Sequence, residues 1–286
     1  MTTTSTTNPP RILAVLAHPD DEAFGMGGTL ALYAQKGARV DLVCATLGEE
    51  GDVRPEFLEN GQTVPEVRKA ELLCSTRALG INRLFLLGYR DSGMAGSPSN
   101  QHPDALAARP LEEIAGRIEA ILAEVKPDVV LTFDPVGGYK HPDHIRIHEA
   151  TVLAFLNARK ALDPANPQGL TRLLFHTMPK HIFKLGIFFT RLQGQDPRKA
   201  GANGDIDLVD IASQDFPTHY VVNYKQVEAQ KISAAACHAS QGGGLQPKGA
   251  LSVLYKAFAR PEDRFMQGWP AVEKNQKIKH DILESR

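Results

Sequence analysis

The chain has 286 residues, of which 42% are hydrophobic and 23% charged, and its formal net charge is −1. This composition is typical of a soluble globular protein with one large domain or one domain and an appendage. The near-neutral charge argues against nucleic acid or an anionic membrane surface as the main partner. No apolar run approaches the roughly 18 residues that span a bilayer, and the opening MTTTSTTNPP does not resemble a signal peptide. We therefore expect a disordered tail over residues 1–10 and a cytoplasmic protein with no membrane span.

Short apolar runs alternate with longer amphipathic runs along the first 180 residues. Apolar runs of this kind predict strands over 12–17, 40–46, 83–89, 128–134 and 172–178. The amphipathic runs predict helices over 22–36, 65–80, 111–125 and 142–158. Strands separated by helices of this length indicate βαβ crossovers and a mostly parallel sheet. We therefore predict an α/β fold, with a Rossmann-like three-layer catalytic domain over residues 11–180.

The pattern loosens after residue 180, where aromatic, basic and glycine residues are mixed. Only a strand over 218–224 and a helix over 225–239 are predicted there. We expect residues 181–286 to form a smaller, irregular C-terminal extension that caps the active-site edge. Its basic residues favour a solvated rim or substrate lip over membrane contact, because no clean amphipathic face emerges.

The three cysteines are Cys44, Cys74 and Cys237, and their spacing shows no pairing. Cys44 lies in a predicted strand and the other two in predicted helices. We predict that all three are buried free thiols rather than redox or catalytic groups.

Three polar segments fall where predicted strands end: HPDDE after the first, LGEEGD after the second and DPVGGYKHPDH after the fourth. In a parallel α/β sheet, ligands bind beyond the carboxyl ends of the strands. Histidines and carboxylates gathered there match a catalytic zinc site, which needs three nitrogen or oxygen ligands and an open position. His18 and Asp21 are three residues apart on a tight turn, and His144 can supply the third ligand. The charge of a metal would also balance the acids.

Two alternatives remain for these segments taken singly. The acids of HPDDE would also interact well with the dipole of the following helix, and HPDH is also typical of a capped helix start. The glycines of FGMGGTLA are a weak dinucleotide-binding signal, because they follow an acidic turn that would repel a pyrophosphate.

The motifs AHPDDE and GGYKHPDH, about 120 residues apart, resemble the PIG-L/LmbE family of zinc-dependent N-acetylglucosamine (GlcNAc) deacetylases. The similarity continues through EVRKAELLCSTRALG and KISAAACHASQ. The segments LGEEG, RDSGMAG and DPVGGYKHPDH are most similar to the mycothiol-pathway deacetylase and S-conjugate amidase of this family. The resemblance implies Zn²⁺ held by His18, Asp21 and His144, with Asp20 as general base. Fe²⁺ accepts the same ligand types and stays an alternative.

The resemblance also assigns three further catalytic residues. His141 would be protonated and would stabilise the oxyanion or donate a proton to the leaving amine. Asp143 would orient His141 and favour its charged form. Tyr139 matches a mobile tyrosine that polarises the amide carbonyl.

Substrate contacts are implied for Arg68 and Asp91, which match residues that hold sugar hydroxyls, and Glu49 stands at a strand end where a substrate contact is reasonable. Each has an ordinary alternative: an ion pair of Arg68 with Glu71, a turn for Asp91 and a solvated loop for Glu49. His148 and His238 are left outside the catalytic set, His238 as a structural histidine.

Together these residues predict a hydrolase that removes an N-acetyl group from a GlcNAc-containing conjugate, giving a free amine and acetate. An amidase for a thiol conjugate or other amide is the nearest alternative, and a non-catalytic sugar- or nucleotide-binding module is the alternative from another class. The expected partner is a small molecule. The sequence leaves the oligomeric state open, with a homo-oligomer as one alternative.

Overall fold

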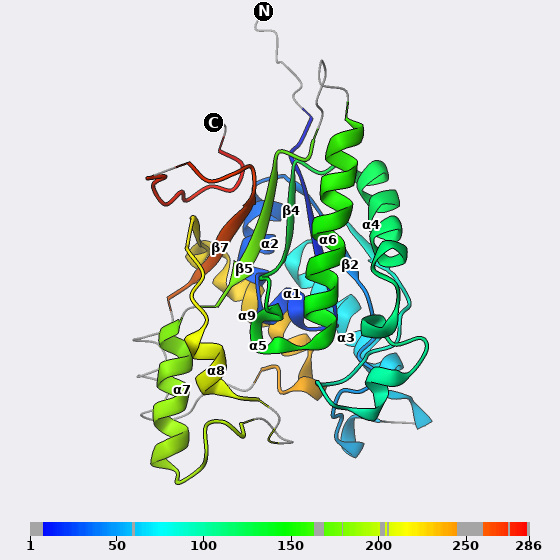
Figure 1. Ribbon diagram of the computed structural model, residues 1–286, viewed down its shortest axis with the longest axis vertical. Helices are drawn as coiled ribbons and strands as arrows, with labels where there is room; N and C mark the ends of the chain where they lie inside the picture. The colour runs from blue at the N-terminus through cyan, green and yellow to red at the C-terminus, as the bar shows by residue number, and fades with distance from the viewer. Residues whose placement is uncertain are drawn as a thin grey trace, which may run out of the picture.

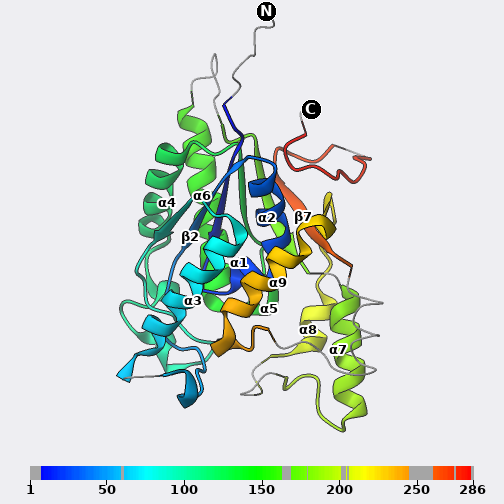
Figure 2. The same cartoon turned by 180° about the vertical axis from the view of Figure 1, so that it is seen from behind.

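The computed structural model describes residues 8–58, 61–162, 169–178, 180–200, 204, 206–244, 260–273 and 275–284. Most of the predicted N-terminal tail therefore lies outside the described residues. A seven-stranded sheet runs through the molecule in the order β3-β2-β1-β4-β5-β7-β6. Helices α4 and α6 cover one face of it and α2, α3 and α9 the other, so the fold has three layers (Figures 1 and 2). The strands are β1 (Arg11–Leu16), β2 (Arg39–Cys44), β3 (Arg83–Leu86), β4 (Val129–Phe133), β5 (Arg172–Thr177), β6 (Tyr220–Asn223) and β7 (Glu262–Trp269).

Three of the α-helices among the described residues have six residues or fewer. The α-helices are α1 (Asp21–Phe24), α2 (Gly27–Gln35), α3 (Val64–Leu79), α4 (Leu111–Val125), α5 (Gly137–Lys140), α6 (Pro142–Ala161), α7 (Lys180–Leu192), α8 (Leu208–Ser213) and α9 (Glu228–Cys237). Short 3-10 turns are η1 (Pro55–Phe57), η3 (Pro98–Gln101), η4 (Leu106–Ala108), η5 (Lys225–Val227) and η6 (Ala239–Gln241).

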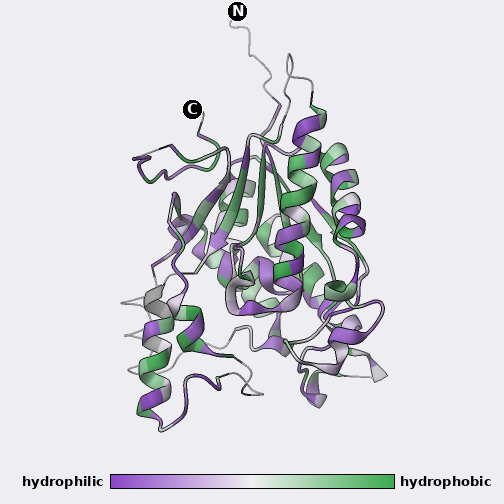
Figure 3. Ribbon diagram, viewed as in Figure 1, coloured by the Kyte–Doolittle hydropathy of each residue, from purple (hydrophilic) through white to green (hydrophobic). Residues whose placement is uncertain are grey.

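Strands β1 to β5 are parallel to one another, which confirms the predicted α/β class. Strand β1 pairs with β2 on one side and β4 on the other, and residues 12–16 are all buried. A central parallel strand covered by helices on both faces is apolar at every position rather than alternating. This is why ILAVL could be recognised as a strand from sequence. Figure 3 shows the hydrophobic residues concentrated in the strands.

The predicted helix boundaries follow from local capping. Helix α3 begins beside Pro65, and the Glu66 carboxylate accepts the backbone N–H of Thr63, as in a capping box. It ends at Gly80, whose φ of 74° is the left-handed conformation that favours glycine. The predicted helix over 22–36 is in fact two helices, α1 and α2, which are separated by Gly25 and Met26.

Strand β7 was not predicted, and its sequence explains why. It pairs antiparallel with both β5 and β6, so it completes the sheet from the C-terminal segment. Two of its inward positions are the buried polar residues Asp263 and Gln267. Asp263 is buried because its carboxylate accepts hydrogen bonds from Thr29 and Lys231. The alternation of apolar and polar residues that marks a strand is therefore lost. Helices α7 and α8 also had no sequence prediction.

The prediction for the cysteines was right for one residue and wrong for two. Cys44 is free and buried. Cys74 of α3 and Cys237 of α9 form a disulfide, with their Cα atoms 5.7 Å apart. Because the two residues are separated by 163 positions in sequence, the contact arises only when α9 packs on α3, and spacing gives no sign of it.

No helix among the described residues is long and apolar enough to cross a membrane. Strands β6 and β7 belong to the same sheet as β5, and α9 packs against α2 and α3. The division of the chain at residue 180 stays a prediction.

Candidate metal-dependent active site

The site lies at the point where the order of the sheet reverses. The chain passes from β1 outward to β2 and β3, then returns to β4 beside β1 and continues outward to β5. The loops that follow β1 and β4 therefore diverge, and the crevice between them is the usual ligand site of an open parallel sheet. The turn 18–21 leaves β1, and residues 137–144 follow β4. The two HPD segments consequently meet at one place, as predicted.

Three predicted ligands present their polar atoms to one point. His18 Nδ1 and His144 Nε2 are 3.1 Å apart, and His144 Nε2 is 3.3 Å from Asp21 Oδ1. His18 Nδ1 is 3.7 Å from Asp21 Oδ2. Bonds of about 2.0–2.2 Å at tetrahedral angles separate the ligand atoms of zinc by about 3.3–3.6 Å. The three separations, measured to two different oxygens of the Asp21 carboxylate, are close to those that a tetrahedral zinc ion requires.

The outer nitrogens of the two histidines are bound to protein acceptors. His144 Nδ1 lies 3.2 Å from the carbonyl oxygen of Gly137 and donates to it. His18 Nε2 lies 3.2 Å from Asp143 Oδ2 and 3.4 Å from Asp91 Oδ1. Outer hydrogen bonds of this kind fix the tautomer of metal-binding histidines and turn the other lone pair inward. The residues present therefore fit a divalent cation. The lone pairs of His18 Nδ1 and His144 Nε2 point toward the Asp21 carboxylate, and a cation there would be bound by all three groups.

The electrostatics of His18 agree with this interpretation. Burial alone would lower the pKa of His18, but the carboxylates of Asp91, Asp143 and Asp21 raise it well above its ordinary value. The surroundings therefore stabilise positive charge at this point. Among the described residues, two sets offer ligand atoms that all lie within 4.8 Å of one another: His18 with His141 and His144, and His18 with Asp91 and Asp143.

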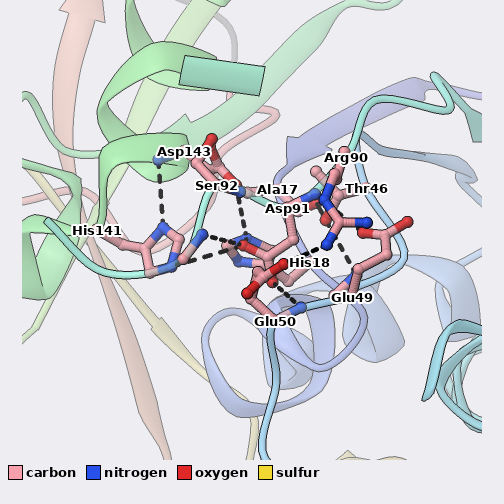
Figure 4. A network of polar contacts seen from close by, with 12 residues as sticks. Ala17, His18, Thr46, Glu49, Glu50, Arg90, Asp91, Ser92, His141 and Asp143 are labelled. Carbon is pink, nitrogen blue, oxygen red and sulfur yellow. Dashed lines mark hydrogen bonds and ion pairs between the residues drawn. The ribbon is translucent and has the colours of Figure 1, made fainter. Parts of the chain in front are cut away.

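Asp143 differs from the expectation. Its carboxylate is fully buried and lies on His18 and Ser92, where it accepts the backbone N–H of Ser92 at 2.9 Å and the Ser92 hydroxyl. His141 contacts Asp143 only through the backbone, since its Nδ1 accepts the Asp143 N–H at 3.2 Å (Figure 4). The cause is local: His141 is the N-cap of α6, so its ring turns back toward the first backbone N–H groups of the helix.

The surroundings of His141 favour its neutral ring. Burial, with the rings of His18 and His144 close by, lowers the pKa of His141 to about 2. Because Nδ1 accepts a hydrogen bond, the proton of the neutral ring is on Nε2. The resemblance implied that Asp143 orients His141 and favours its charged form, but the Asp143 carboxylate contacts His18 and Ser92 instead of His141.

Tyr139 lies over the same histidines. Its ring centroid is 5.0 Å from that of His144 and 5.9 Å from that of His141, in edge-on geometry. Burial, with the charges of Asp21 and Asp20, raises the pKa of Tyr139 well above its ordinary value. The hydroxyl therefore keeps its proton and can donate it in a hydrogen bond.

The carboxylate of Asp20 is held in place by Arg68. The Arg68 Nη2 atom is 3.0 Å from Asp20 Oδ2 and also donates to the carbonyl of Pro19, while Nη1 donates to the carbonyl of Gly48. Gly48 must be glycine, because a Cβ there would lie 1.7 Å from Arg68 Nη1. Burial raises the pKa of Asp20 to about 7, although the charge of Arg68 opposes the shift.

Arg68 is therefore not part of a surface ion pair. It is buried, with 4% of its surface exposed, and Glu71 binds elsewhere: its carboxylate accepts the backbone N–H and the hydroxyl of Ser240, both at 2.7 Å. The expected alternative for Arg68 can be set aside.

Asp91 lies beside Nε2 of His18, on the opposite side of the ring from the nitrogen that faces His144, and Glu49 lies next to Asp91. Asp91 is 4% exposed, and its carboxylate accepts the backbone N–H groups of Gly93 and Glu50. The Glu49 carboxylate accepts the Asp91 backbone N–H at 2.9 Å (Figure 4). Burial would raise the pKa of Asp91, but His18 and these hydrogen bonds hold it well below its ordinary value. Both residues support the position of His18.

Sequence reasoning missed Glu22 as a site residue. Glu22 was grouped with the acids of the HPDDE turn, yet it is 1% exposed and its carboxylate binds the backbone N–H of Asp20, the Ser75 hydroxyl and His238. His238 was assigned a structural role. A buried glutamate is rarely without partners, but nothing in this acidic stretch marks Glu22 as buried, and its partner His238 is 216 residues away in sequence.

Comparison with known proteins identifies the class to which this site belongs. Residues 13–155 match the PIG-L family, described as GlcNAc-PI de-N-acetylase. The chain belongs to this family.

Several relatives with assigned names are similar to this chain over most of its length. A 1D-myo-inositol 2-acetamido-2-deoxy-alpha-D-glucopyranoside deacetylase of Thermomonospora curvata is 45% identical over 81% of this chain and 80% of its own. A protein with the same name from Acidothermus cellulolyticus is 37% identical over 84% of this chain and 82% of its own. Among solved structures, the N,N'-diacetylchitobiose deacetylase of Pyrococcus horikoshii has a similar fold, with a TM-score of 0.57 and 20% identity, covering 91% of this chain and 84% of its own.

Proposed function

We propose that the protein hydrolyses the N-acetyl group of a GlcNAc-containing conjugate, releasing a free amine and acetate. The observation that carries this proposal is the convergence of His18, Asp21 and His144 beside Asp20 in a chain of the PIG-L family. The relatives named above act on a GlcNAc-inositol, so this glycoside is the first substrate to test.

Zinc is the proposed cofactor, with His18 Nδ1, Asp21 and His144 Nε2 as its ligands. Bound there, it would supply a Lewis acid that lowers the pKa of water to about 7 and polarises a carbonyl oxygen. Asp143 and Asp91 hold His18 in the required tautomer, and the Gly137 carbonyl does the same for His144.

The remaining residues move or hold protons. Asp20 takes a proton from water as general base, and Arg68 keeps its carboxylate in place. The Tyr139 hydroxyl donates a hydrogen bond to the carbonyl oxygen as negative charge develops there. His141 donates from Nε2, because its Nδ1 is occupied by the Asp143 backbone N–H. We propose that it serves as a neutral hydrogen-bond donor to the oxyanion, while Asp20 passes the proton it took from water to the leaving nitrogen as the C–N bond breaks.

Arg68, Asp91 and Glu49 were expected to contact the sugar. Their polar atoms are bound to Asp20, His18 and the backbone around them. We propose that they act by orienting these groups. A location in the cytoplasm and a homo-oligomeric state also stay proposals, to be checked by fractionation and by light scattering.

The test is amine release from a panel of substrates: the GlcNAc-inositol glycoside, N,N'-diacetylchitobiose, free GlcNAc and an S-conjugate amide of the glucosaminyl-inositol series. Each is assayed with zinc-loaded protein, chelator-stripped protein and Asp20→Asn. We expect release from a GlcNAc glycoside that disappears on stripping, returns with one equivalent of zinc and falls about 10²–10⁴-fold in Asp20→Asn.

The other outcomes identify the alternatives. Release only from the S-conjugate would replace the deacetylase with an amidase. Tight binding of a glycoside with no release, unchanged by Asp20→Asn, would contradict catalysis and favour a binding module.

A further inference from the structure

A buried chain of hydrogen bonds leads from the site to the C-terminal segment. One carboxylate oxygen of Glu22, Oε2, accepts the backbone N–H of Asp20 at 3.0 Å. The other oxygen, Oε1, accepts from His238 Nε2 at 2.6 Å and from the Ser75 hydroxyl. Glu22 and His238 are 1% and 0% exposed. Both oxygens of a buried carboxylate are thus committed, one to the turn that carries Asp20 and one to helices α3 and α9.

The turn at Asp20 requires such support. Asp20 has φ 118° and ψ −29°, in the left-handed region that residues other than glycine rarely adopt. Conformations of this kind persist only where the surrounding contacts determine them, and they concentrate at functional sites. The Asp20 carbonyl accepts the N–H groups of Ala23 and Phe24, Arg68 holds the carboxylate, and Glu22 holds the N–H. Glu22 therefore controls the one backbone group of Asp20 that the helix does not.

The chemistry of His238 argues against a purely structural role. Its ring is completely buried, and Nδ1 makes no hydrogen bond to any residue in the described part of the chain. A buried nitrogen without a partner is costly, whereas an apolar ring would fill the same space without that cost. The hydrogen bond to Glu22 is what the imidazole adds. Its ring also packs edge-on against Phe24, at 5.9 Å between centroids, as a phenyl ring could.

The same segment is docked by two other contacts that do not reach Asp20. Ser240 donates two hydrogen bonds to Glu71 of α3, and the Cys74–Cys237 disulfide joins α3 to α9. The segment could act by docking on α3 or by positioning Asp20. The Ser240 and disulfide contacts contribute only to docking, so they allow the two roles to be tested separately. Ser240 is therefore a matched control for His238.

We propose that Glu22 and His238 are positioning residues for Asp20, the general base of the function proposed above. His238 fixes Glu22, and Glu22 fixes the strained turn, so that the Asp20 carboxylate meets the water that it deprotonates. The residues do not touch the substrate, so their loss changes kcat and leaves KM nearly unchanged. The inference rests on the proposed function only in its choice of Asp20 as the base.

The first experiment compares four zinc-loaded variants with the wild type: His238→Phe, His238→Gln, Glu22→Gln and Ser240→Ala. Phe keeps the ring and removes the donor, and we expect kcat to fall about 10–100-fold, as for other residues that orient a metal site, with KM changed less than about threefold. Gln keeps an N–H donor and should recover part of the rate. Ser240→Ala should keep kcat within about twofold of wild type. Melting curves and one zinc per chain verify that each variant is folded and loaded.

A double variant tests whether the two residues act together. If His238 works through Glu22, combining His238→Phe with Glu22→Gln lowers kcat no further than the more damaging single variant does. Effects that multiply would contradict a shared role. Equal kcat for His238→Phe and Ser240→Ala would also overturn the proposal and leave His238 as a docking residue.

A second readout does not depend on activity. Amide hydrogen exchange, followed by mass spectrometry on the peptide that contains residues 18–24, reports the Glu22 contact with the Asp20 N–H. We expect faster exchange in His238→Phe and Glu22→Gln than in wild type, and no change in Ser240→Ala. If the wild type cleaves no substrate of the panel, the proposed function fails, while this exchange result still decides whether His238 holds the turn. Unchanged exchange in His238→Phe would overturn the inference.

Discussion

The turns that follow β1 and β4 and the segment from α9 to η6 contribute to the same site in different ways. The turns carry the groups proposed to meet metal and substrate, and each places several polar residues within a few positions of a strand end. The α9–η6 segment contributes His238, Ser240 and a disulfide, which contact Glu22 and helix α3. The proposed chemistry is thus concentrated in short local motifs, while part of the positioning comes from a distant part of the chain. Four experiments test whether the two regions have these different roles.

The largest effect should come from a ligand in the turn that follows β4. His144→Ala removes one corner of the triangle formed with His18 and Asp21, so we expect loss of stoichiometric zinc and a fall in rate of at least about 10³-fold, because several kcal/mol of charge stabilisation disappear. The measurement is zinc per chain by mass spectrometry, together with the rate of amine release.

His148→Gln is the matched control. His148 is a buried histidine one helical turn further along α6, where its Nδ1 binds the Phe133 carbonyl. We expect this variant to keep its zinc. Full zinc content in His144→Ala would contradict the ligand assignment.

The second effect concerns Arg68, where the contacts and the resemblance disagree. Because the guanidinium holds Asp20 and two carbonyl groups, Arg68→Met should lower kcat about 10–100-fold with little change in KM. A residue that held sugar hydroxyls would instead raise KM and spare kcat. Steady-state kinetics decides between the two. Arg109→Met, which removes a surface ion pair with Glu113, is the control and should leave both constants unchanged.

The third effect separates docking from positioning within the C-terminal segment. Replacing Cys74 and Cys237 together with serine removes the link between α3 and α9, so we expect a loss of about 2–4 kcal/mol in the free energy of unfolding. The kcat should change less than about threefold, since Ser240 and His238 still hold the segment. Denaturant unfolding and initial rates measure the two quantities. A large loss of kcat with unchanged stability would mean that the disulfide itself positions the site.

The smallest effect is a pH dependence of stability. Burial alone would lower the pKa of His238, but Glu22 raises it above its ordinary value. The folded state then binds the proton more tightly than the unfolded state, so this stabilisation is complete below about pH 6.5 and is lost as the pH rises through the folded pKa. The difference in the free energy of unfolding between the wild type and His238→Phe should therefore decrease above pH 6.5, by up to about 1.4 kcal/mol per pH unit. A constant difference between pH 6 and 9 would show that the pair does not titrate as proposed.

The contrast between the two regions also explains which features could be predicted from sequence. Strands β1, β2 and β4 are mostly apolar because both of their faces are covered, and the polar residues after β1 and β4 must meet at one sheet edge. Periodicity and topology therefore predicted the parallel sheet and the convergence of His18, Asp21 and His144.

The features that were missed depend on packing between distant segments. Asp263 of strand β7 can be buried because Thr29 and Lys231, which belong to helices packed on the sheet, donate hydrogen bonds to its carboxylate. Cys74 pairs with Cys237 only when α9 packs on α3. The carboxylate of Asp143 was expected on His141, but the backbone at the start of α6 turns it toward His18. Spacing along the chain gives no measure of such orientations.

The most direct test of the central claim is a metal titration. Protein stripped of metal receives zinc from zero to two equivalents, and the initial rate of acetate release from the GlcNAc-inositol glycoside is measured at each step. The account predicts a rate that rises linearly and breaks at one equivalent, with His144→Ala inactive throughout. Full activity before any zinc is added, or a rate that never depends on the metal, would contradict the proposal that His18, Asp21 and His144 form the catalytic centre.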